Sequence, residues 1–259
     1  MASSDSPIGP ARATELKQAL TGDAEQLRRI VRQADLEVVR AALKNVHCCE
    51  EHLLLIAQRP DLDGLFCKTL CKHSLVRRKP VALALVRHPQ LPPPQLKTVL
   101  QWLQLFDLVR LCQQPGLHQD VRVAAERAII ERLPGCPLGN RISLARRTGS
   151  AVLQALIQEG QPQVVEACLD NPHLKEAALY LLLNGPYATP QVIRLIASHP
   201  RWQRRPHLQR AIARNSQTPA DLFRQLLGSL PADEIRNLLL SQRLGARQKS
   251  WLRSFLGQN

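Results

Sequence analysis

Aromatic residues are scarce in this sequence, and their shortage determines what fills the core. Phe, Trp and Tyr together make up 3% of the 259 residues, whereas 44% of the chain is hydrophobic. Leu, Ile, Val and Ala must therefore supply most of the buried area, which suits slender helices packed side by side. The same shortage argues against single-strand nucleic-acid binding, because such proteins stack bases on aromatic rings.

Long apolar runs and paired cysteines are missing as well. The longest apolar clusters, such as residues 179–183, fall far below the ~20 residues that cross a bilayer, and residues 1–14 contain no apolar run of signal-peptide length. Seven cysteines without a Cys-x-x-Cys pair indicate neither a disulfide framework nor a redox motif. We therefore expect a soluble, cytoplasmic protein.

Catalytic signatures are also absent. The 12 glycines form no phosphate-binding loop, and no Gly-x-Ser-x-Gly motif is present. Most carboxylates fall in first helical turns or on solvated faces, as at Glu50 and Asp233. We predict that the chain is not an enzyme and has no small-molecule substrate.

What the sequence does contain is an internal duplication. When the chain is shifted by 126 residues, the segment from Val38 to Arg87 aligns with a second copy, with one inserted residue near its end. The matches fall on apolar positions at helical spacing, on prolines and on cationic turns, which is typical of a repeated helical unit. The clearest pairs are Asn45 with Asn171, His47 with His173, His73 with His199, Arg78 with Arg204, and Pro80 with Pro206.

Prolines divide the chain into many short helices. The 19 prolines would disrupt long helices, but they are tolerated between short ones or in a first helical turn. Asn-Pro and His-Pro steps end helices and Thr-Pro steps begin them, while Thr14 and Asp23 are expected as N-caps and residues 23–26 have capping-box spacing. Because no segment alternates like a strand, we predict an all-α fold, a right-handed α-solenoid of short stacked helices with an internal duplication.

The expected domain limits follow from this pattern. Residues 1–13 are expected to form a flexible N-terminal tail, and residues 14–259 a single α-helical repeat domain. In that domain, copy one spans about residues 36–103, connecting helices about 104–160 and copy two about 161–227. Helices over about residues 231–256 are expected to cap the array.

The recurring breakers also carry a resemblance to a known kind of protein. Examples are Asn171-Pro172-His173-Leu174, Gly185-Pro186-Tyr187-Ala188-Thr189-Pro190 and Asn215-Ser216-Gln217-Thr218-Pro219. This pattern of helix breakers resembles that of bacterial α-helical repeat proteins of the leucine-rich-repeat-variant and HEAT-like kind, from about Leu36 to Leu227. The resemblance implies a scaffold, adaptor or nucleic-acid binder. Some of the similar proteins carry an iron–sulfur cluster in an N-terminal cysteine motif, which this chain lacks.

Soft metal ligands gather in copy one. The residues that would suit zinc or an iron–sulfur cluster are His47, Cys48, Cys49, His52, Cys67, Cys71 and His73. The second copy has apolar residues opposite three of these four cysteines, so we interpret the thiols as small buried hydrophobes. We expect no metal and no cofactor, and we interpret the recurring histidines as turn caps rather than catalytic groups.

Positive charge is the remaining signal. The formal net charge is +14, and Gly64–Phe106 holds seven Lys or Arg without an acidic residue, while Ala177–Ala220 holds six, again without one. In each copy a cationic turn precedes a proline-started helix, where cations and free backbone N–H groups would face one anion together. The candidate anion-binding residues are Lys72, Arg77, Arg78, Lys79, Arg87, Arg201, Trp202, Arg204, Arg205, Arg210 and Arg214.

Several functions fit this pattern. The favoured one is a non-enzymatic scaffold that binds an acidic macromolecular partner, preferably a protein, through a basic stripe formed by these residues. Sequence-independent DNA or RNA binding through phosphates is the alternative, and a DNA-repair-type enzyme on a HEAT-like scaffold is a weaker one. Unspecific surface charge also stays open, and Trp202 would either stack on a base or lie against Arg side chains.

Overall fold

The computed structural model describes residues 9–228, 230–241 and 244–257. All regular structure in these ranges is helical, and no strand forms within them. Among the same residues, no helix combines the length and the apolar character needed to cross a membrane. The prediction of an all-α chain of short helices is confirmed.

The chain divides into two compact units, Met1–Ala128 and Ile129–Asn259, here called unit 1 and unit 2. The helices of unit 1 are α1 (Pro10–Thr21), α2 (Ala24–Gln33), α3 (Leu36–Ala42), α4 (Glu50–Ala57), α5 (Gly64–Leu70), the 3₁₀-helix η1 (Ser74–Arg77), α6 (Lys79–Val86), α7 (Pro93–Trp102) and α8 (Leu105–Cys112). The longer helix α9 (Gln119–Arg132) runs from unit 1 into unit 2.

Unit 2 continues with short helices of the same kind. They are η2 (Leu133–Gly135), α10 (Leu138–Arg147), α11 (Ser150–Ile157), α12 (Pro162–Leu169), α13 (Glu176–Asn184), α14 (Pro190–Ser198), α15 (Pro206–Ala213), α16 (Ala220–Leu227), α17 (Ala232–Leu239) and α18 (Ala246–Gly257).

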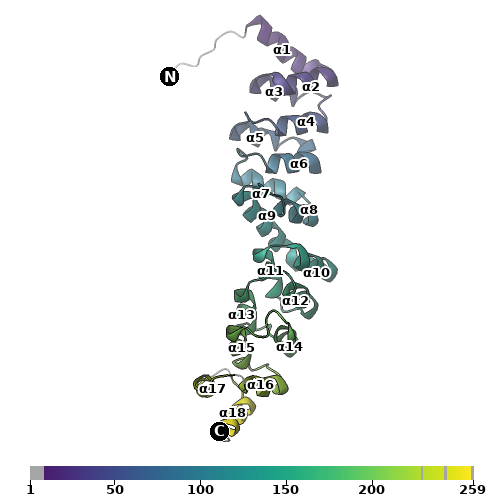
Figure 1. Cartoon of the computed structure of the whole chain (residues 1–259). Helices are drawn as coiled ribbons and strands as arrows, with labels where there is room; N and C mark the ends of the chain where they lie inside the picture. Colours follow the sequence, from purple (N-terminus) through teal and green to yellow (C-terminus); the bar gives the residue numbers. More distant parts are fainter. Residues whose placement is uncertain (1–8, 229, 242–243, 258–259) are drawn as a thin grey trace. The chain divides into compact units, whose positions relative to one another are not determined.

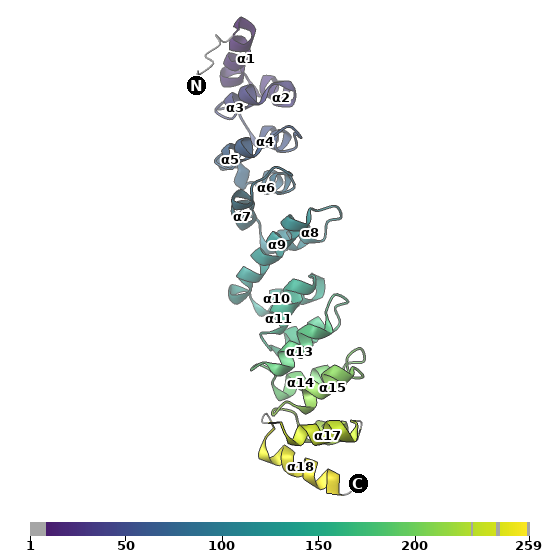
Figure 2. The ribbon, with the colours of Figure 1, turned by 90° about the vertical axis from the view of Figure 1, so that its left-hand side faces the viewer.

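Alternate helices pack against each other within each unit. In unit 1, α1 contacts α3, α2 contacts α4, and α4 contacts α6. Figures 1 and 2 show α3, α5 and α7 on one side of this unit and α2, α4 and α6 on the other. In unit 2 the corresponding contacts join α10 with α12, α12 with α14, α11 with α13, and α13 with α15. Each unit is therefore built from two rows of short helices.

Local sequence explains where the first helices begin. Asp23 caps α2 as predicted, since its carboxylate accepts from the N–H of Gln26 at 2.8 Å and its own N–H donates to the Gln26 side chain at 3.2 Å. The expected start at Thr14 is wrong: α1 already begins at Pro10, which suits a first helical turn, and Thr14 Oγ donates to the Pro10 carbonyl inside the helix. Of the expected flexible tail, residues 1–8 lie outside the described residues.

The duplication is visible in the helix boundaries. Adding 126 to the first residues of α2, α3, α4 and α5 gives the first residues of α11, α12, α13 and α14. The offset is 127 for α6 with α15 and for α7 with α16. The repeated unit therefore begins earlier than the sequence comparison indicated, because α2 and α11 belong to it.

The core has the predicted aliphatic character. Its fully buried side chains are mostly Leu, Ile, Val and Ala, and Phe66 and Phe223 are the largest of them. Near the C-terminal end, Phe223 and Leu227 of α16 join a cluster with Ile235 of α17 and Leu252 of α18. Helices therefore do form where the closing pair was expected.

Candidate partner-binding surface

A buried asparagine after α3 fixes the turn that follows it and ties it to α1. Asn45 Nδ2 donates to the carbonyls of Ala19 and Gly22, both at 3.0 Å. Its Oδ1 accepts from the N–H of His47 at 2.8 Å. One side chain therefore sets the local turn and satisfies two carbonyls at the end of a neighbouring helix, which would otherwise be buried without partners.

The second copy repeats this arrangement at Asn171. Its Nδ2 donates to the carbonyls of Ala145 and Thr148 at 2.8 and 3.2 Å, and its Oδ1 accepts from the N–H of His173 at 2.8 Å. All three partners lie 126 residues after those of Asn45. The asparagines recur in sequence because they perform the same structural role twice.

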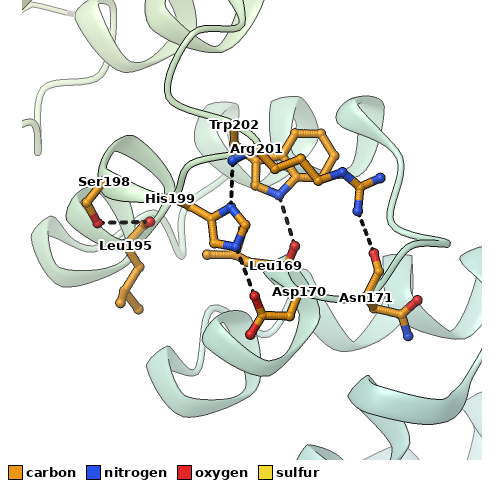
Figure 3. A network of polar contacts seen from close by, with 8 residues as sticks. All are labelled: Leu169, Asp170, Asn171, Leu195, Ser198, His199, Arg201 and Trp202. Carbon is orange, nitrogen blue, oxygen red and sulfur yellow. Dashed lines mark hydrogen bonds and ion pairs between the residues drawn. The ribbon is translucent and has the colours of Figure 1, made fainter.

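Of the two recurring pairs of histidines, the pair His73 and His199 caps turns, as predicted. Nδ1 of His73 accepts from the N–H of Leu75 at 3.3 Å, and Nδ1 of His199 accepts from the N–H of Arg201 at 3.2 Å. Figure 3 shows that Nε2 of His199 also lies 3.1 Å from a carboxylate oxygen of Asp170. Both rings are therefore oriented by turn contacts.

At a third pair of equivalent positions, copy one has a histidine and copy two has an asparagine. His88 follows α6, where its Nδ1 accepts from the N–H of Gln90 at 3.2 Å and its Nε2 lies 2.9 Å from the carbonyl of Arg59. Since Nδ1 accepts, the proton sits on Nε2, which donates to that carbonyl. The matching position after α15 is Asn215, whose Nδ2 donates to the carbonyl of Leu183 at 2.6 Å.

In copy one, part of the basic turn is already engaged within the protein. Lys79 Nζ lies 2.5 Å from a carboxylate oxygen of Asp107, whose side chain is only 6% exposed. The guanidinium of Arg77 lies over the ring of Trp102, 5.8 Å from its centre. Lys79 is thus bound to a nearly buried acid and is poorly placed to meet a partner, whereas Arg77 makes only a weak contact.

In copy two, Arg201 is held by the backbone of the turn after α12. Its Nη1 donates to the carbonyl of Asn171 at 2.8 Å (Figure 3). Its Nη2 donates to the carbonyls of Pro172 and Leu174 at 3.2 and 3.1 Å. These three contacts engage both terminal nitrogens of the guanidinium. Arg201 therefore caps a neighbouring turn instead of presenting a free cation.

Trp202 packs inside unit 2. Its side chain lies under the guanidinium of Arg201, 4.4 Å from the ring centre, and its Nε1 donates to the carbonyl of Leu169 at 3.1 Å. Only 3% of the residue is exposed. Of the two alternatives for this residue, contact with an Arg side chain is the one observed, and the buried ring offers no face on which a base would stack.

The remaining candidate cations fall into two groups. Arg210 is paired with Glu234, with nitrogen–oxygen distances of 2.8 and 2.9 Å, and Arg87 donates to the side-chain oxygen of Gln114. The other group consists of exposed cations whose side chains have no ion pair, hydrogen bond or ring contact to the described residues: Lys72, Arg78, Arg204, Arg205 and Arg214.

Of the four cysteines among the candidate metal ligands, Cys67 is buried, Cys48 and Cys71 are half-buried, and Cys49 is exposed, contrary to the interpretation of all four as buried. Burial raises the pKa values of Cys48, Cys67 and Cys71 to about 11, so these thiols stay protonated at neutral pH. In the part of the chain that the structure describes, no three His, Cys, Asp or Glu side chains converge in a way that would hold a metal ion.

Two grooves were not anticipated from the sequence. One, of about 420 Å³, lies between the turns after α13 and α15 and includes Arg214, and the other, of about 710 Å³, lies between the turns after α6 and α8 and includes Arg87. A sequence signal does exist, because residues 87–92 and 214–219 share one pattern. Both segments have Arg at the first position, His or Asn at the second, Gln at the fourth and Pro at the sixth. This repeat would have drawn attention to both turns.

Comparisons with known proteins add no further identification: no family model, no curated protein and no solved structure matches this chain.

Proposed function

We propose that this protein is a non-enzymatic helical-repeat scaffold that binds an acidic partner, preferably a protein, through the cations of its two basic turns. In this proposal each unit is a stretch of right-handed α-solenoid of the leucine-rich-repeat-variant or HEAT-like kind. The packing of alternate helices and the recurrence of turns at a fixed offset support this reading.

The observation that carries the proposal is the state of the charges in the two turns. Lys72 and Arg78 in unit 1, and Arg204 and Arg205 in unit 2, have exposed side chains without partners in the described structure. By contrast, Lys79 and Arg210 in the same regions each have an acidic partner. Uncompensated cations at equivalent turns produce a positive field that attracts an acidic surface and speeds its association.

Nucleic-acid binding is the second candidate, because arginine forms bidentate contacts with phosphate as well as with carboxylate. Among nucleic acids, a duplex contacted through its backbone fits this protein better than a single strand. Single-strand binding would use exposed aromatic rings, and Trp202 in the second basic turn is buried.

The test is binding measured by fluorescence anisotropy over a salt series. The probes are a fluorescein-labelled oligoglutamate peptide, a random-sequence DNA duplex and a single-stranded RNA. We expect the peptide to bind at low salt, and the combined change of Arg77, Arg78, Arg204 and Arg205 to Ala to remove most of this binding. The matched control changes Lys17, Arg32, Arg146 and Arg253, which are exposed cations outside the two turns, to Ala.

The outcomes separate the two candidates. If the protein neutralises about six phosphates of the duplex, a plot of log K for binding against log[salt] should have a slope of about −5. Such a slope, reduced by the four Arg changes and not by the control, would move the assignment to nucleic acid. Equal losses in both fourfold variants would leave only unspecific surface charge.

A further inference from the structure

The groove beside Arg214 has an unusual balance of charge. It lies within unit 2, and Arg214 is the only formally charged residue among the described residues that line it. The other lining residues are Leu183, Asn184, Gly185, Pro186, Ala188, Asn215, Ser216 and Gln217. A site of this kind has one cation, several neutral polar groups and no carboxylate to neutralise it.

The walls of the groove are fixed by hydrogen bonds. Asn215 donates to the carbonyl of Leu183 at 2.6 Å and accepts from the N–H of Gln217 at 2.8 Å. The first bond joins the turn after α15 to the last residues of α13, and the second sets the turn that carries Ser216. The lining is therefore organised before any partner arrives, which lowers the entropy cost of binding.

Helix ends at the groove would ordinarily repel an anion, because the carboxyl end of a helix carries partial negative charge. Here several of the carbonyls concerned are already occupied. The carbonyl of Leu182 accepts from the N–H of Gly185 at 3.0 Å, and the carbonyl of Ile212 accepts from Thr218 Oγ at 2.5 Å. Together with the bond from Asn215 to Leu183, these contacts leave Arg214 as the dominant charge.

The duplication supplies an internal comparison. In unit 1 the equivalent residue, Arg87, directs Nε and Nη2 at the same side-chain oxygen of Gln114, at 3.1 and 2.8 Å. That groove also includes the carboxylate residue Asp120. The guanidinium after α6 thus already has a neutral acceptor across its groove, whereas Arg214 has no such acceptor among the described residues.

Two exposed tyrosines are near the groove of unit 2 in sequence, although neither belongs to its lining. Tyr180 and Tyr187, the two tyrosines of the chain, are 44% and 59% exposed. Tyr187 directly follows the lining residue Pro186, and the carbonyl of Tyr180 accepts from Asn184, another lining residue, at 2.8 Å. Tyrosine and arginine are, with tryptophan, the residues enriched where binding energy concentrates in protein interfaces.

We propose that this groove receives a carboxylate side chain of an acidic protein segment, bound by Arg214 in the way that Gln114 is bound by Arg87. The carboxylate would accept two hydrogen bonds from the guanidinium and a further one from Ser216. This inference rests on the proposed function and names the group that the partner inserts in unit 2.

The test compares three single variants that lower the net charge equally. Arg214→Gln removes the cation, Ser216→Glu supplies an internal carboxylate that competes for it, and Arg247→Gln removes an exposed cation on α18, outside the groove. The probe is the oligoglutamate peptide, and circular dichroism of each variant monitors folding. We expect the first two changes to raise Kd about tenfold, as for loss of a charged hydrogen-bond pair, and the third to raise it less than about twofold.

Two results would overturn the inference, and they are distinguishable. If Arg214→Gln weakens binding no more than Arg247→Gln, while the fourfold change in the basic turns still removes binding, the groove is not a carboxylate site but the proposed function stands. If the unaltered protein does not bind oligoglutamate even at low salt, both proposals fail together.

Discussion

At the scale of single residues, the side chains that recur between the copies are the ones that hold turns in place. Asn45 and Asn171 each make three hydrogen bonds with equivalent partners. Both are almost fully buried, at 5% and 3% exposure. A polar residue at a buried position persists because removing it leaves several backbone groups without partners.

Replacing Asn171 with Ala should therefore destabilise the protein by about 2 to 3 kcal/mol, since two carbonyls and one N–H lose their partner. Urea unfolding followed by circular dichroism measures this change. Asn237→Ala serves as the control, because Asn237 is an exposed residue of α17. A loss at Asn171 no larger than that of the control would show that water replaces the amide without cost.

The thiols provide a second prediction at this scale. Burial raises the pKa of Cys168 to about 12 and those of Cys48, Cys67, Cys71 and Cys112 to about 11, whereas Cys49 is exposed. A raised pKa lowers the thiolate fraction, to about one part in a thousand at pH 8 for a pKa of about 11.

Iodoacetamide at pH 8 should accordingly label Cys49 first and label Cys168 only after unfolding in guanidinium. Peptide mass spectrometry at successive times gives the order of labelling, and Cys49→Ser should remove the fast phase. Rapid labelling of Cys168 in the folded protein would contradict the burial on which its raised pKa depends.

At the scale of single helices, two neighbouring N-caps behave differently. Asp23 forms a complete capping box with Gln26, whereas Asp35, at the start of α3, makes no side-chain cap hydrogen bond. Asp35 has only a 3.7 Å contact with Arg12, and both side chains are well exposed. Such surface pairs contribute little to stability.

Asp23→Ala should therefore cost about 1 kcal/mol of unfolding free energy, the usual effect of losing an N-cap. Asp35→Ala is its matched control and should change stability by less than about 0.5 kcal/mol. Thermal and urea unfolding of both variants provides the comparison. Equal effects would show that the Asp23 capping box adds nothing beyond its charge at the helix start.

Sequence patterns predicted the helices better than they predicted the site. Proline positions, the capping box at Asp23 and the 126-residue offset depend on local geometry and on spacing, and the structure retains all of them. The engagement of Lys79 with Asp107 and the burial of Trp202 depend on contacts 28 and 33 residues away in the chain. No local pattern encodes those contacts. The sequence alone therefore could not show which of the candidate residues are already engaged or buried within the protein.

At the scale of the whole molecule, each unit carries one basic turn with cations that lack partners among the residues that the structure describes. If both turns contact the same kind of partner, their contributions should be separable because they lie in different units. Mutations at distant positions that share no partner have additive effects on free energy.

We therefore expect two double variants, one with Arg77 and Arg78 changed to Gln and one with Arg204 and Arg205 changed to Gln, to reduce oligoglutamate affinity by similar amounts. Their combined loss of binding free energy should match that of the fourfold change to Gln. Anisotropy titrations at one fixed salt concentration measure all three. A fourfold variant no weaker than one double variant would show that a single turn carries the binding.

The two basic turns differ in length, so the offset between equivalent helices rises from 126 residues before the turn to 127 after it. The distance along the chain from His199 to the start of α15 is one residue longer than that from His73 to the start of α6. The turn of copy one contains the 3₁₀-helix η1, whereas the described turn of copy two contains no 3₁₀-helix. The framework has thus been copied while the segments facing solvent have been free to diverge. A chain of this kind can evolve a new specificity in one copy while the other keeps its original ligand, and so become a connector between two different proteins.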